Sequence, residues 1–139
     1  MKTLNMIALM LLIHGTAYAD VRIDRIIQVE SSGNPRAVSK ADCRGLMQMS
    51  RIAWADVRKH YPEMKYDFDK YAFDPVVNVR MGTLYLEIIK NKYLKGGGSD
   101  KDILICYHDG LGNWKKWKRG ERKLGREMLQ NLARYGVKI

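Results

Sequence analysis

The first apolar residues after residue 20 recur at the spacing of a helix with one buried face. Ile23, Ile26 and Ile27 follow the i, i+3, i+4 pattern of such a face. Glu30 continues the pattern at i+7, which places a carboxylic acid on the apolar face. The segment Ser31–Pro35 contains a glycine and a proline, so the helix is expected to end there.

Four further segments have the periodicity or the end signals of helices: about 52–60, Pro75–Ile88, Ser99–Tyr107 and about 121–135. Asp74 is suited to cap the helix that begins at Pro75, and Ser99 is suited to cap the one over residues 99–107. Gly136 is a typical helix stop. An alternation over residues 66–71 is too brief and too acidic to indicate a strand. We therefore predict an all-α fold with a small irregular excursion near residues 61–74.

Length and composition limit the class of protein. The chain has 139 residues, which fits one domain and excludes large doubly wound and barrel architectures. Its hydrophobic content of 46% is too high for a disordered chain. The formal net charge of +10 favours an anionic partner such as nucleic acid, acidic lipid or an anionic cell-wall polymer. Charge that serves solubility alone is the alternative.

Residues 1–19 have the features of an export signal. Lys2 supplies a positive start, residues 6–13 are an unbroken apolar run, and residues 17–19 give a small-residue cleavage site. The run is shorter than the roughly 20 residues of a membrane span, so cleavage is expected rather than an uncleaved anchor. We predict an exported protein, periplasmic or secreted, with a single domain over residues 20–139.

Glu30 is the most informative single position. Burial and the negative end of the helix dipole both raise the pKa of a carboxyl group placed there. A carboxylic acid that keeps its proton near neutral pH is what general-acid cleavage of a glycosidic bond requires. The alternative is a glutamate at the edge of the apolar stripe, with its head group in water.

Three blocks of residues follow one another between about residues 24 and 117. They comprise Glu30–Pro35, Ala37–Ser39 and Arg44–Gln48; then Phe73–Pro75 with Asn78, Gly82, Tyr85 and Leu86; and then Cys106–Gly110 with Gly112–Trp114 and Trp117. In this order and at this spacing, the blocks resemble the soluble lytic transglycosylase family of peptidoglycan-cleaving enzymes.

The resemblance implies a lysozyme-like all-α fold with a cleft for glycan strands, and it assigns Glu30 as the catalytic acid. Ser39 falls at the family's serine that faces the substrate. Met47 and Gln48 match the pair that lines the cleft floor, and Tyr107 matches the tyrosine that hydrogen-bonds and orients the glutamate. Each has a simpler alternative: Met47 as ordinary core, Ser39 as a helix cap and Tyr107 as a buried aromatic residue.

His108 and Asp109 depart from the family pattern, in which asparagine, alanine and glycine follow the tyrosine. His108 stands at the position of the asparagine and is taken as a candidate substrate-binding residue, with contacts that must differ from those of the family. Asp109 adds a carboxylate that the pattern lacks.

Cys43 and Cys106 are too few for a disulfide-dense miniprotein or a four-cysteine zinc site. After export they could form a disulfide, and two buried free thiols are the alternative. Neither belongs to the family's core pattern. If Gln48 and Tyr107 both approach the catalytic acid, the cysteines upstream of each would be neighbours, which mildly favours a bridge.

The resemblance implies a mechanism with one carboxylic acid and no cofactor. Glu30 would act first as an acid on the glycosidic bond and then as a base, giving a 1,6-anhydromuramoyl product. The enzymatic alternative is a hydrolytic, lysozyme-type muramidase in which Asp109 or Asp42 activates water. No metal is expected, because His60 and His108 have no partners at ligand spacing.

The expected partners are peptidoglycan strands, with no nucleic acid. A secretion, conjugation or phage lysis apparatus is one setting, and wall remodelling is another. The alternative from another class is a cationic protein without catalysis, because residues 114–119 interleave tryptophan with lysine and arginine, and Arg122, Lys123 and Arg126 follow. Such a segment could bind phosphates or an acidic membrane; we interpret it as a basic, wall-facing surface beside the cleft.

Overall fold

The computed structural model of the protein describes residues 22–138, and the predicted export signal over residues 1–19 lies outside them. Within the described residues the regular structure is helical and the only β contacts are isolated bridges, which confirms the predicted all-α class. The elements are α2 (Ile23–Ser31), α3 (Arg51–His60), α4 (Phe68–Tyr71), α5 (Pro75–Glu87), the π-helix η1 (Ile88–Tyr93), α6 (Asp100–Asp109), α7 (Leu111–Lys118) and α8 (Arg126–Tyr135). No helix in this range combines the length and the apolar character needed to span a bilayer.

The predicted helix starts at Asp74 and Ser99 are confirmed. The Asp74 carboxylate accepts a hydrogen bond from the backbone N–H of Val77 at 2.9 Å, so it caps α5. Ser99 and Asp102 form a capping box at the start of α6, in which each side chain accepts from the backbone of the other residue. These local bonds explain why both starts could be predicted.

Three features differ from the prediction. α8 begins at Arg126 rather than near residue 121, because Gly125 is its N-cap and not an interior residue. α4 lies within the segment expected to be irregular, and α7 was not predicted. α7 follows α6 directly, since Gly110 turns the chain at a φ of 84° that favours glycine.

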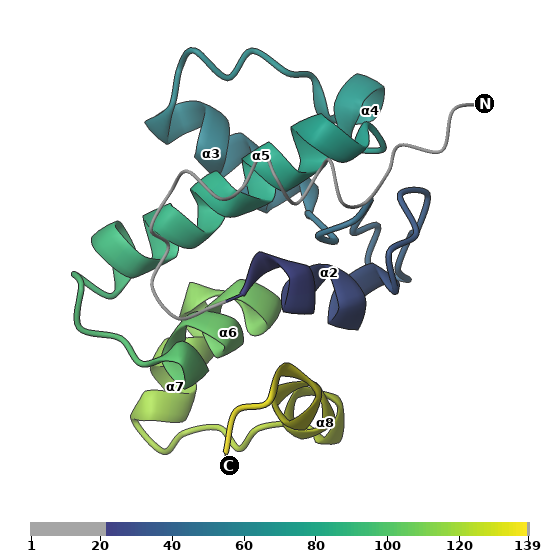
Figure 1. The fold of residues 1–139 in the computed structure, drawn as a ribbon. Coiled ribbons are helices and arrows are strands. Elements are labelled where there is room, and N and C mark those ends of the chain that lie inside the picture. The colour runs from purple at the N-terminus through teal and green to yellow at the C-terminus, as the bar shows by residue number, and fades with distance from the viewer. Residues whose placement is uncertain (1–21, 139) are drawn as a thin grey trace.

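The helices form two groups around a continuous core. One group contains α3, α4 and α5, and the other contains α2, α6, α7 and α8. Figure 1 shows α3 and α5 together at one end of the molecule and α8 at the other, with α2 and α6 between them. α3 packs on α5, whereas α8 packs on both α2 and α6. The largest fully buried side chains come from both groups and include Trp54, Met81, Ile26, Ile105 and Leu132.

Asn78 fixes the loop over residues 32–50, which connects α2 to α3. Its fully buried side chain donates to the carbonyls of Arg44 and Ala72 at 2.9 and 2.8 Å and accepts from the N–H of Met47 at 2.8 Å. Gly45 passes so close that a Cβ there would lie 2.3 Å from the Asn78 amide nitrogen, and its φ is 79°. The loop therefore reaches the centre of the molecule in one defined conformation.

Candidate active site

Glu30 occupies the position that the apolar pattern predicts, one residue before the end of α2. Ile26 and Ile27, on the same face, are almost completely buried. Glu30 itself is half-buried. The helix ends immediately after it, because Ser32 adopts a left-handed conformation with a φ of 52°. The carboxyl group therefore lies at the negative end of the helix dipole.

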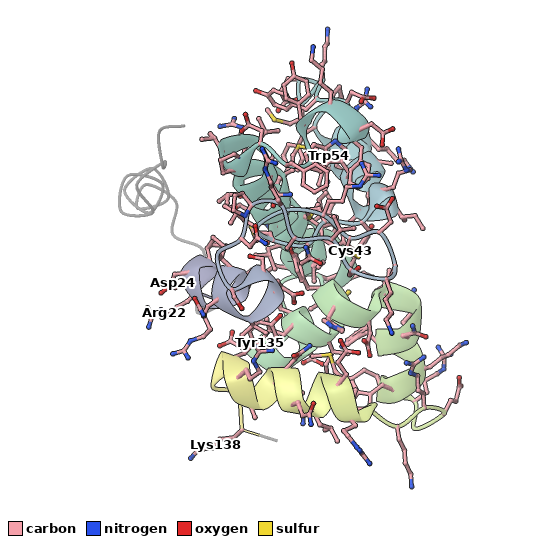
Figure 2. The ribbon with its side chains drawn as sticks, turned by 90° about the vertical axis from the view of Figure 1, so that its right-hand side faces the viewer. Arg22, Asp24, Cys43, Trp54, Tyr135 and Lys138 are labelled. Atoms are coloured by element: carbon pink, nitrogen blue, oxygen red, sulfur yellow. The ribbon has the colours of Figure 1, made fainter. Side chains whose placement is uncertain are left out.

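Tyr135, the last residue of α8, holds this carboxyl group. Its hydroxyl donates a hydrogen bond to Oε1 of Glu30. Figure 2 shows Tyr135 in the space between α8 and α2. The sequence analysis did not identify Tyr135 as a partner of Glu30. The available signal was that a half-buried tyrosine hydroxyl needs a polar partner.

Burial raises the pKa of Glu30 above its ordinary value. The hydrogen bond from Tyr135 and the charge of His108 act in the opposite direction without cancelling the effect of burial. Among the more distant charges, Glu127 raises this pKa and Arg134 lowers it. The group therefore keeps its proton to a higher pH than an exposed glutamate does.

Tyr107 makes a different contact from the one that the resemblance implies. Its hydroxyl donates to the backbone carbonyl of Met47 at 2.6 Å, and its ring packs against that of Tyr85 with centroids 5.7 Å apart. Glu30 still acts on Tyr107, since burial and then the Glu30 charge raise the tyrosine's pKa. The hydrogen bond to the glutamate comes from Tyr135 instead, because α8 covers the end of α2.

Met47, Gln48 and Ser39 shape the loop beside the site. The side chain of Met47 is fully buried, and a Cβ on Gly82 would lie 2.5 Å from its sulfur, so its visible role is packing. The Gln48 amide donates to the carbonyls of Ala37 and Gly45, both at 3.0 Å. Ser39 is exposed, and its hydroxyl accepts from the N–H of Cys43 at 3.0 Å. Glycan contacts by Ser39 and Gln48 stay predictions.

His108 is held by residues of two helices. Its Nδ1 lies 3.0 Å from Oδ1 of Asp109, and its Nε2 lies 3.1 Å from the amide nitrogen of Asn131 on α8. The Glu127 carboxylate is 3.8 Å from the same Nε2. The hydrogen bond with Asp109 raises the pKa of His108 and burial lowers it; the Glu30 charge adds to the increase, so the net shift is upward.

Both cysteines are free in the structure, and the bridge that the expected approach of Gln48 and Tyr107 to the acid mildly favoured stays a prediction. Cys106 is fully buried in the core, and this burial raises the pKa of its thiol to about 12. Cys43 is half-buried and acts electrostatically on Tyr107. Cys106 and Tyr107 are consecutive on α6, so their side chains face different directions. A position of Cys43 close to Tyr107 therefore does not bring its thiol to Cys106.

The two carboxylates considered for hydrolysis are each bound to a cation or an imidazole. The exposed Asp42 accepts from the Arg44 guanidinium at 2.8 and 3.0 Å. Asp109 pairs with His108 at 3.0 Å. Among residues 22–138, no cluster of three or more His, Cys, Asp or Glu side chains could hold a metal ion.

The basic aromatic segment forms α7 and the turn after it. The indole N–H of Trp114 donates to the buried Asp102 at 2.9 Å, and Trp117 packs against the core, so both rings have structural roles. The lysines and arginines of residues 115–126 are exposed. They form a basic surface, as the sequence predicted, on a helix that packs against α6.

A small cavity lies between α2, α6 and α8, with Tyr135 in its wall. Its volume of about 90 Å³ has room for a few water molecules and is too small for a disaccharide. Glu30 is not part of its lining. The glycan cleft implied by the resemblance therefore stays a prediction.

Comparison with known proteins connects this site to one family. Residues 18–130 match the family described as Transglycosylase SLT domain. Membrane-bound lytic murein transglycosylase C of Pectobacterium atrosepticum is 34% identical over 113 residues, which cover 78% of this chain and 32% of that protein. The protein of the same name from Klebsiella pneumoniae strain 342 is 38% identical over 113 residues, covering 78% and 31%. That of Yersinia pestis strain Pestoides F is 46% identical over 93 residues, covering 63% and 26%. The chain spans about a third of the length of these relatives or less.

Proposed function

Because the chain belongs to the transglycosylase SLT domain family, we propose that it is a peptidoglycan lytic transglycosylase. The proposed substrate bond joins N-acetylmuramic acid to N-acetylglucosamine. The observation that carries the proposal is Glu30, a half-buried carboxylic acid with a raised pKa and a hydroxyl partner. The names of the relatives, which are lytic murein transglycosylases, support the same substrate.

The reaction begins with protonated Glu30. The carboxylic acid donates its proton to the glycosidic oxygen, and the bond from this oxygen to C1 of N-acetylmuramic acid breaks. Positive charge develops at C1, where the carbonyl oxygen of the sugar's own 2-acetamido group stabilises it. Burial, which raises the pKa of Glu30, supports this first step.

In the second step Glu30 acts as the base. Its carboxylate removes the proton of the C6 hydroxyl, and O6 closes onto C1 of the same sugar. The product is a 1,6-anhydromuramoyl end, and no water is consumed. Tyr135 keeps its hydrogen bond to one oxygen of Glu30 and leaves the other to exchange the proton. The binding of Asp42 by Arg44 and of Asp109 by His108 favours this mechanism over hydrolysis.

We also propose that Ser39, Gln48 and His108 contact the glycan, and that the protein acts after export. Ser39 and Gln48 lie on the loop that Tyr107 ties to α6 through the Met47 carbonyl, and His108 acts electrostatically on Glu30. The exposed cations after residue 114 would face the anionic wall.

Digestion of purified peptidoglycan tests the proposal. Wild-type protein should release muropeptides with 1,6-anhydro ends, read by mass spectrometry. Glu30→Gln should reduce this release by about a thousandfold or more, because general acid–base catalysis contributes about 10²–10⁴-fold at each step.

The matched control is Glu63→Gln, which removes an exposed glutamate and should leave the digestion unchanged. Reducing ends without anhydro sugar would show a hydrolase. Undiminished cleavage by Glu30→Gln would refute the assignment of the acid, and a lack of cleavage by wild type with retained polyanion binding would favour the non-catalytic alternative.

A further inference from the structure

His108 connects the two helices that surround Glu30. It lies on α6 beside Asp109, and its other ring nitrogen contacts Asn131 of α8. α8 also carries Tyr135, the partner of Glu30. Asn131 is buried, so its side chain is confined at this contact. The imidazole of His108 therefore contacts Asp109 of α6 and Asn131 of α8 directly, and it acts on Glu30 of α2 through its charge.

The contacts of His108 satisfy both of its protonation states. With a proton only on Nδ1, the ring donates to Asp109, and Nε2 accepts from the Asn131 amide at 3.1 Å. A second proton on Nε2 makes the ring a cation, which the Asp109 carboxylate stabilises at Nδ1. The Glu127 carboxylate, 3.8 Å away, stabilises the same charge. The site can thus hold His108 with or without a positive charge.

We propose that His108 is a positioning residue that sets the upper pH limit of catalysis, because its imidazole is held by Asp109 and by Asn131, one helical turn before Tyr135, the hydroxyl partner of Glu30. This inference rests on the proposed function of Glu30 as the acid. It assigns His108 a role that an asparagine, the residue of the family pattern, cannot have, because only the imidazole changes charge near neutral pH.

The charges around Glu30 determine the direction of the effect. From α6 it is faced by His108 and Tyr107, and from α8 by Tyr135, Glu127 and Arg134. The cations His108 and Arg134 favour the ionised carboxylate, whereas Glu127 opposes it. His108 is the one with an imidazole side chain, whose ordinary pKa of about 6.5 lies close to neutral pH.

The coupling between the two groups is reciprocal. If imidazolium favours the Glu30 carboxylate, the carboxylate must favour imidazolium by the same free energy. This gives a test that needs no cleavage of peptidoglycan. The pKa of His108, followed by NMR of the imidazole, should be lower in Glu30→Gln than in wild type. The His60 signals, from a ring on α3 that contacts Asp56, provide the internal reference.

The second test is the pH profile of kcat/KM. Activity falls at high pH as Glu30 loses its proton, so removing a nearby cation should move this alkaline limb to higher pH. We expect this shift for His108→Asn, a variant that restores the residue of the family pattern. His60→Asn, which removes a histidine from α3, should keep the wild-type profile. Thermal melting of each variant verifies folding.

An unchanged His108 titration in Glu30→Gln would overturn the inference even if cleavage proceeds as proposed. An alkaline limb that stays in place in a folded His108→Asn would overturn it too. Loss of rate in His108→Asn with an unshifted profile would indicate glycan contact or packing only. Persistent cleavage by Glu30→Gln would instead refute the proposed function, and the NMR result would still report on the coupling.

Discussion

Two carboxyl groups at opposite helix ends, the buried Asp102 and the half-buried Glu30, have opposite pKa shifts. Asp102 lies in the first turn of α6, where it accepts from Ser99, Trp114 and Lys118. Burial raises the pKa of Asp102, but the hydrogen bonds from these donors together lower it by more, so the net shift is downward. Glu30 lies in the last turn of α2, has one hydroxyl donor, and its pKa is raised. The position in the helix and the number of donors thus decide whether a buried carboxyl group stabilises the fold or retains a proton.

The largest expected effect is on stability, at Asp102. Asp102→Ala removes the capping box and the partner of the buried indole, which should lower the free energy of unfolding by about 3 kcal/mol at pH 7. Because the folded-state pKa of Asp102 is depressed, its ionic contribution is present above the ordinary value of 3.8 and is lost as pH falls through the folded pKa. Urea denaturation at pH 7 and in acid measures both.

Glu63→Ala removes an exposed acidic residue outside the helices and is the control, with a much smaller expected loss. Equal losses for the two variants would mean that the contacts of Asp102 with Ser99 and Trp114 add nothing to stability.

The next effect is on rate, at Tyr135. Tyr135→Phe keeps the ring but removes the hydroxyl that orients Glu30, so kcat should fall about 10- to 100-fold. Since the hydrogen bond lowers the pKa of Glu30, its loss should also move the alkaline limb of the activity profile to higher pH. Steady-state kinetics across pH would show both changes.

Tyr61→Phe is the matched control, because the Tyr61 hydroxyl donates to Glu87 at 2.8 Å at the opposite end of the molecule. It should leave kcat and the profile unchanged. If Tyr135→Phe and Tyr61→Phe lose activity equally, the loss reflects a general decrease in the stability of the fold rather than the orientation of Glu30.

The smallest effect is a gain in stability from Glu30→Gln. A raised folded-state pKa means that stability falls as pH rises from the ordinary value of 4.5 through the folded value. The glutamine variant avoids this loss, so it should melt higher than wild type at pH 7, by up to about 4 °C per 1 kcal/mol gained. The two proteins should converge near pH 4. A variant that melts lower than wild type at pH 7 would mean that the ionised carboxylate stabilises the fold.

Local signals in the sequence explain what could be predicted. The starts of α5 and α6 were found because Asp74 and Ser99 bond to backbone only three residues away. Glu30 was found because its helix repeats a simple apolar pattern. The four-residue α4 is too short to show a period, and the start of α8 was missed because Gly125 caps the helix instead of lying within it.

Long-range contacts explain what was missed. The tyrosine partner of the acid was assigned to Tyr107 from a motif, whereas the packing of α8 on α2 brings Tyr135 there. The mild preference for a bridge between Cys43 and Cys106 rested on Gln48 and Tyr107 both approaching the acid, whereas in the structure Cys106 is buried in the core and both thiols are free. Such contacts depend on the angle between helices, which no local pattern contains.

The partner of Glu30 is 105 residues further along the chain. During synthesis the glutamate leaves the ribosome early, and its tyrosine follows only after every other described helix has been made. A nascent chain, or one truncated before α8, therefore has Glu30 without the hydrogen bond from Tyr135. The hydroxyl partner of Glu30 is therefore in place only once α8 has been translated and has docked.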